Sequence, residues 1–97
     1  MKLRQRLPPN EYGFSLCRTP AGKLVNGPVA SGTPNSVNIP VSCPAGSRFI
    51  GLDHSHPGGV AVPSSIDIAS AKKVGARVLC IQSDTETRCH KMGNRRR

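Results

Sequence analysis

The amino-acid sequence predicts an α+β fold, a mixed sheet with one main helix packed against it. Two observations lead to this class. Apolar runs of strand length, built mainly from Val, Ile and Leu, recur along the chain between stretches rich in Gly, Pro, Asn and Ser. One segment alone has clear start and stop signals of a helix. The length of 97 residues allows one domain.

The first half of the chain predicts short antiparallel strands. Alternating side chains over 11–19 indicate a strand, and a Pro- and Gly-containing turn follows at 20–23. Residues 24–30 would return antiparallel near a sheet edge, because a Gly-Pro pair interrupts them. A loop is expected over 31–38, and a short strand over 39–43 between two prolines.

The second half carries the central strand and the helix. Residues 47–54 form the clearest strand, with an apolar start. The helix is expected over 65–74, with Gly75 placed to end it. Residues 76–83 have the composition of a buried strand, and a last short strand is expected near 86–90.

The charge distribution separates the ends of the chain from its body. The net charge is +9, and half of the fourteen basic residues lie near the two ends. We therefore expect a basic arm over 1–10, a domain over 11–90 and a basic tail over 91–97. Such ends bring weak, salt-sensitive attraction to polyanions and do not by themselves make a nucleic-acid site.

Location and cysteine chemistry follow from composition. No apolar run approaches the roughly 20 residues of a membrane span, so we expect no membrane partner. The first residues lack the apolar core of a secretory signal, which favours a cytoplasmic location. Reduced thiols are therefore expected, although oxidation would allow three pairings of Cys17, Cys43, Cys80 and Cys89.

A candidate metal site lies where the central strand gives way to the helix. His54 and His56 alternate along an extended segment, so they share a face. Asp67 falls in the first turn of the following helix, and the three side chains together offer three ligands for zinc. The alternative for Asp67 is a capping box, in which it bonds back to Ser64.

Five residues with fixed spacing strengthen the metal interpretation: His54, His56, Pro57, Ser64 and Asp67. With ten residues between His56 and Asp67, the set resembles the JAMM motif of the MPN metalloprotease family, His-x-His-Pro followed by Ser-x-x-Asp. The small size resembles the prokaryotic and phage-type branch of that family. The resemblance covers about residues 8–83 and implies an MPN-like sheet. The family's first helix is expected to be missing, because only ten residues, two of them proline, precede Glu11.

A catalytic glutamate is also implied by the resemblance. The segment Pro9-Asn10-Glu11-Tyr12-Gly13 is similar to the family's early Pro-x-Glu followed by glycine. Glu11 and Asp53 are the only acidic residues before the histidines, and Asp53 neighbours His54 and so points to the opposite face. Glu11 is therefore the predicted general base.

The resemblance implies an activity and a set of partners. Zn²⁺ would be held by His54, His56 and Asp67, Glu11 would move protons, and Ser64 would donate a hydrogen bond to the oxyanion. The reaction would be hydrolysis of a peptide or isopeptide bond in a protein or peptide substrate, ubiquitin-like proteins being one class in the family. Two alternatives are a non-catalytic MPN scaffold module and a DNA-associated protein similar to the RadC branch.

Overall fold

The computed structural model describes residues 7–93, so the expected basic arm and basic tail lie largely outside the described residues. The elements are, in order, β1 (Tyr12–Arg18), β2 (Leu24–Asn26), β3 (Ala30–Ser31), β4 (Arg48–Ser55), α1 (Ser65–Lys73), β5 (Val78–Gln82) and β6 (Thr87–Lys91). The α+β class and the mixed sheet with one main helix are confirmed. The segment from Leu7 to Glu11, just before β1, is not helical.

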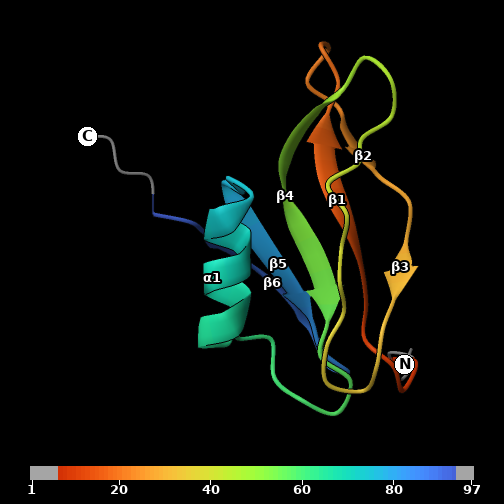
Figure 1. The fold of residues 1–97 in the computed structure, drawn as a ribbon, viewed down its shortest axis with the longest axis vertical. Helices are drawn as coiled ribbons and strands as arrows, with labels where there is room; N and C mark the ends of the chain where they lie inside the picture. Colours follow the sequence, from red (N-terminus) through yellow and green to blue (C-terminus); the bar gives the residue numbers. More distant parts are fainter. Residues whose placement is uncertain (1–6, 94–97) are drawn as a thin grey trace, which may run out of the picture.

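β4 lies in the middle of the sheet, whose order is β2-β1-β4-β5-β6 with β3 also paired to β1. β4 and β5 are parallel, and the other pairs are antiparallel. A parallel pair requires a crossover connection, which the loop after β4 and α1 supply. Figure 1 shows α1 on one side of the sheet, joined to the end of β4 by a single loop.

Two predicted strands differ from the structure. The strand expected over 24–30 is divided into β2 and β3. Gly27 still donates its amide to the Ser15 carbonyl and lies so close to the Ser42 carbonyl that a Cβ would overlap it, but Pro28 after it has no N–H for the ladder. The strand expected over 39–43 is wrong. Pro40 within it and Pro44 directly after it have no N–H for a ladder, and the segment is held against β1 by the Ser15 hydroxyl, which donates to the Pro40 oxygen at 3.1 Å and accepts from the Ser42 amide at 3.1 Å.

The core between α1 and the sheet is made of small and aliphatic side chains: Leu52, Ala61, Ala71, Ala76, Leu79 and Ile81. Ala71 is the buried residue of α1, whereas Ile66 is 75% exposed. A helix with so little buried surface depends on its ends for its position. Its N-terminus has a full capping box between Ser64 and Asp67.

The expectation of reduced thiols is wrong for this structure. Disulfides join Cys17 to Cys43 and Cys80 to Cys89, and the described residues have no free cysteine. The first bridge ties β1 to the segment before β4, and the second joins directly opposed residues of β5 and β6. Sequence spacing left the pairing open because it depends on which strands become neighbours.

The residues that the structure describes contain one helix, α1. α1 has nine residues, and no helix between residues 7 and 93 has the length and apolar character needed to cross a membrane.

Candidate metal centre

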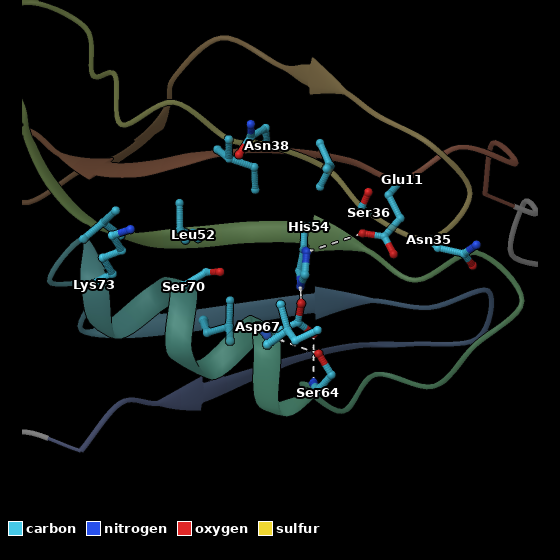
Figure 2. Close-up of a pocket in the computed structure, with 15 residues that line it drawn as sticks. Glu11, Asn35, Ser36, Asn38, Leu52, His54, Ser64, Asp67, Ser70 and Lys73 are labelled. Atoms are coloured by element: carbon cyan, nitrogen blue, oxygen red, sulfur yellow. Dashed lines mark hydrogen bonds and ion pairs between the residues drawn. The ribbon is translucent and has the colours of Figure 1, made fainter.

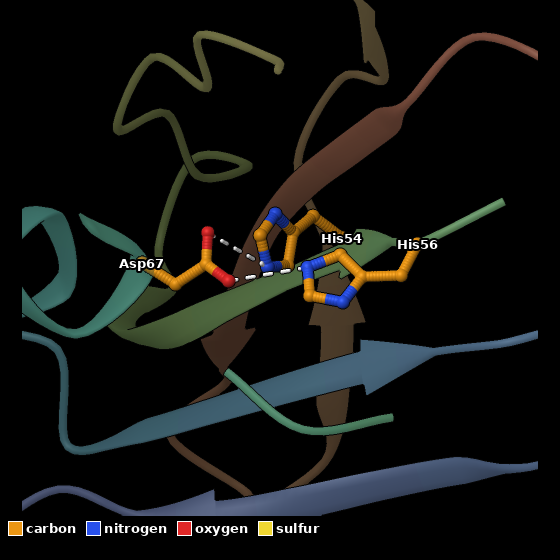
Figure 3. Close-up of side chains that lie close together, drawn as sticks. All are labelled: His54, His56 and Asp67. Carbon is orange, nitrogen blue, oxygen red and sulfur yellow. Dashed lines mark hydrogen bonds and ion pairs between the residues drawn. The ribbon is translucent and has the colours of Figure 1, made fainter. Parts of the chain in front are cut away.

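The two histidines leave the end of β4 on the same side of the sheet. His54 lies within β4, and His56 is the first residue beyond it. Ser55 between them points the other way, and its hydroxyl accepts a hydrogen bond from the Tyr12 amide at 2.9 Å. Because side chains alternate along a strand, Ser55 holds β4 to β1, whereas the rings of His54 and His56 lie together on the opposite face (Figure 3).

Asp67 combines the two roles that its sequence context offers. Its Oδ2 accepts from the Ser64 amide at 2.8 Å, as a capping box requires, and also lies 3.1 Å from His56 Nε2. Its Oδ1 lies 3.6 Å from His54 Nε2. One ligand atom from each of the three side chains lies within 4.8 Å of the others, so capping orients the carboxylate toward the rings.

The partners of His56 indicate which ring nitrogen carries the proton. Its Nδ1 lies 3.0 Å from the Val60 carbonyl oxygen, which can only accept, so we assign the proton to Nδ1. Nε2 of the neutral ring then has a lone pair facing another acceptor, Asp67 Oδ2. Such a pair repels unless a proton or a cation lies between them. A carbonyl on the far ring nitrogen is the usual arrangement of a metal-binding histidine.

His54 lies in an environment that leaves one of its ring nitrogens unsatisfied. Its side chain is buried, and Nε2 is the one buried side-chain nitrogen or oxygen between residues 7 and 93 that lacks a hydrogen-bond partner. An unsatisfied buried polar atom costs about 1–3 kcal/mol. Burial lowers the pKa of His54, and the charge of Asp67 partly offsets this effect. The lowered pKa favours the neutral ring, which is the form that binds metal ions. Two imidazoles and a carboxylate are ligands that zinc accepts, so these residues fit a zinc ion.

Glu11 lies on the other side of the His54 ring. Its backbone is fixed by hydrogen bonds to Thr33 and Gly32 at 2.8 Å each, and its Oε1 lies 3.8 Å from His54 Nδ1 (Figure 2). Burial raises the pKa of the Glu11 carboxyl; the positive charge that His56 carries when it is protonated opposes this rise, and the charge of Asp67 adds to it. A carboxylate with a raised pKa is a better proton acceptor near neutral pH.

Ser64 lies at the centre, and Asp53 lies away from it. The Ser64 hydroxyl oxygen accepts from the Asp67 amide at 3.1 Å, so its own proton is left for another acceptor. Asp53 does not line the site; its Oδ1 accepts from Gln82 Nε2 at 2.7 Å, and burial raises the pKa of its carboxyl.

A groove of about 480 Å³ extends from this centre along α1 (Figure 2). Its sides are α1 and the loop at 35–39, and the floor includes Leu52 and Leu79. Lys73 lies toward the far end of the helix. Sequence reasoning missed the groove residues of the loop, because its Asn- and Ser-rich composition indicates only a loop and not where it folds.

Asp84 also supports the centre, although no sequence pattern pointed to it. In the turn between β5 and β6, its Oδ1 accepts from the Leu7 amide at 3.1 Å and its Oδ2 from the Gly58 amide at 3.2 Å. One carboxylate therefore holds both the segment that leads into Glu11 and the loop that follows His56.

Comparison with known proteins gives one match. The family described as prokaryotic homologs of the JAB domain matches residues 32–95, about two thirds of the chain, including both histidines, Ser64 and Asp67. Glu11 lies before the matched segment. Neither the curated proteins nor the solved structures yield a match. The predicted resemblance is thus confirmed at the level of the family, and the chain belongs to the prokaryotic homologs of the JAB domain.

Proposed function

We propose that this protein is a zinc-dependent metallopeptidase that hydrolyses a peptide or isopeptide bond. One observation carries the proposal: Nε2 of His54 and Nε2 of His56 both face the Asp67 carboxylate, and neither atom has another hydrogen-bond partner among residues 7–93. A divalent cation shared by the three side chains would satisfy all of them. A chance pair of histidines on a sheet would not need a buried, unpaired nitrogen.

The roles of the residues follow from their positions. Zinc, when bound, would supply Lewis acidity that lowers the pKa of a water molecule to about 7 and polarises a carbonyl. Glu11 takes a proton from the attacking water and returns it to the leaving amine, which its raised pKa favours. Ser64 donates a hydrogen bond from its hydroxyl to the oxyanion and keeps its proton. Asp67 acts as a ligand while its bond to the Ser64 amide keeps it oriented.

The proposed substrate is a protein or peptide that enters the groove beside α1 in an extended form. Ubiquitin-like proteins are the class implied by the family resemblance. The basic ends of the chain, with Arg95, Arg96 and Arg97 at one of them, would add weak attraction to polyanions.

A cytoplasmic location is part of the proposal. The two disulfides of the structure count against it, because such bridges are rare in that compartment, so the state of the cysteines tests this part of the proposal. Alkylation of thiols at the moment of cell lysis, followed by mass spectrometry, should show free cysteines if the protein works in the cytoplasm.

The experiment that tests the function has two readouts. Elemental analysis of the purified protein should find about one equivalent of zinc, matching one three-ligand site. A peptide with a Gly-Gly tail on a lysine side chain should be cleaved, cleavage should stop with a chelator, and Zn²⁺ should restore it. Bound zinc without hydrolysis of any amide substrate would favour the scaffold module, and salt-dependent DNA binding without hydrolysis the RadC-like protein. No zinc at all would refute the centre.

A further inference from the structure

A row of four cations crosses the sheet on the face away from α1: Arg18, Arg48, Arg77 and Lys91. Arg18 and Lys91 end β1 and β6, Arg48 begins β4, and Arg77 directly precedes β5, so the four come from neighbouring parts of the sheet. Arg18 pairs in register with Arg48, and Lys91 pairs with Val78, the neighbour of Arg77. Because strands lie about 4.8 Å apart, this cation row extends over about 15 Å.

An aliphatic floor lies beside the cation row, made by Leu16, Ile50 and Val78. All three are only partly buried. Val78 points away from α1 because the next residue, Leu79, belongs to the core. Ile50 joins the same face because a register shift between β1 and β4 leaves it without a paired residue.

Carboxylates do not balance the cation row. The five acidic residues of the chain are all engaged elsewhere: Glu11 and Asp67 at the metal centre, Asp53 with Gln82, Asp84 with two backbone amides, and Glu86 with Arg88. None of the four cations has an ion-pair partner among residues 7–93.

The cation row is unfavourable for the chain by itself. Like charges placed directly opposite on antiparallel strands, as Arg18 and Arg48 are, destabilise the sheet. In addition, the parallel pair of β4 and β5 lies under this face, and parallel strands are normally covered on both sides. An apolar floor and unbalanced positive charge together require a cover that is apolar and anionic.

We propose that the cation row and the aliphatic floor are a docking surface for an acidic amphipathic helix of a partner protein. A helix is about 10 Å wide, close to two strand spacings, and acidic residues one turn apart recur about every 5–6 Å, close to the spacing of the cations. Nucleic acid fits less well, because no aromatic side chain lines this pocket for a base to stack on, and Phe14, on the same face of β1, is only partly exposed. The chain's own ends, 1–6 and 94–97, contain cations and no acidic residue, so they do not complement it.

A synthetic helical peptide of Leu and Glu, with the leucines on one face, is the probe for this surface. The full chain should bind the labelled peptide in a fluorescence anisotropy titration. The double variant Arg48→Glu/Lys91→Glu should weaken binding at least about tenfold and should bind the same peptide with Lys in place of Glu. The matched variant Lys72→Glu/Arg88→Glu has the same net charge, but Lys72 is on α1 and Arg88 is on the other side of β6, so binding should be unchanged.

Three results would overturn the proposal. A peptide of the same composition whose leucines are scattered should not bind; equal binding would mean simple attraction of a polyanion. Equal weakening by both double variants would mean that net charge alone matters. Tighter binding of single-stranded DNA, lost in Arg48→Glu/Lys91→Glu, would assign the surface to nucleic acid. Circular dichroism and metal content of the variants, together with Arg48→Gln/Lys91→Gln, separate loss of binding from loss of fold.

Discussion

At the level of single residues, Asp67 shows how a capping residue and a metal ligand can be the same side chain. Its Oδ2 accepts from the Ser64 amide and faces His56, while Oδ1 faces His54. A carboxylate has two oxygens and about four lone-pair positions, so the two roles do not compete. The sequence presents them as alternatives, but the geometry makes the cap a support for the ligand.

Replacing His56 by Ala should remove the metal while the fold persists. The ring is half-buried and makes one contact with Val60 besides those at the centre, so stability should change little. Losing one of three ligands should lower zinc affinity by more than the 10–100-fold that a supporting residue costs. Zinc retained at one equivalent by His56→Ala after dialysis against a weak chelator would contradict the site. His90→Ala, at the one other histidine of the chain, is the control and should keep its metal.

Glu11→Gln should separate metal binding from turnover. The amide keeps the size of the side chain but cannot accept the proton, and the loss of a general base typically costs about 10²–10⁴ in kcat. Zinc content should remain, because Glu11 is 3.8 Å from His54 Nδ1 and is outside the ligand cluster. Full activity would show that another base operates. Glu86→Gln, at an exposed glutamate, should behave like the original protein.

At the level of elements, the pairing of β1 with β4 fixes the position of His54. Gly13 on β1 is in register with His54 on β4, and a Cβ at Gly13 would lie 2.9 Å from the His54 Cβ and 2.7 Å from the Asp53 carbonyl oxygen. The glycine is thus needed for close approach and not for a turn.

Gly13→Ala should both destabilise the fold and weaken metal binding. Overpacking of this kind costs about 1–3 kcal/mol, which urea unfolding would detect, and displacement of His54 should lower zinc affinity in a chelator competition. Gly93→Ala is the matched control, since a Cβ there meets nothing within 4 Å. An unchanged unfolding midpoint for Gly13→Ala would mean that the two strands are farther apart than the structure has them.

At the level of the whole molecule, the chain is small and poor in large apolar side chains, with no Trp, one Tyr and two Phe. A domain of this size buries only about 60–65% of its unfolded surface, so covalent or metal links matter for stability. The disulfide between Cys17 and Cys43 joins the segment at 39–43 to β1, next to which Pro40 and the following Pro44 cannot donate to a ladder. That bridge closes 26 residues, and the one between Cys80 and Cys89 closes nine.

Removal of the longer bridge should cost more stability than removal of the shorter one. On the chain-entropy account, Cys17→Ala/Cys43→Ala should lose about 3–4 kcal/mol and Cys80→Ala/Cys89→Ala about 2–3 kcal/mol, measured by urea unfolding of the zinc-loaded proteins. The reverse order, or no loss in either variant, would mean that the bridges do not contribute in this way.

The sequence by itself determined the fold class, the family and the residues of the centre. These follow from local rules: strand alternation places His54 and His56 on one face, and a capping pattern places Asp67 in the first turn of the helix. Only the tertiary structure decided what depends on contacts between distant segments. The break at 27–28 and the prolines at 40 and 44 made the strands differ from the prediction. The arrangement of the segments in space determined the disulfide pairs, and the fold of the loop at 35–39 formed one side of the groove. Residue spacing describes one chain segment at a time, whereas these features need the packing of several.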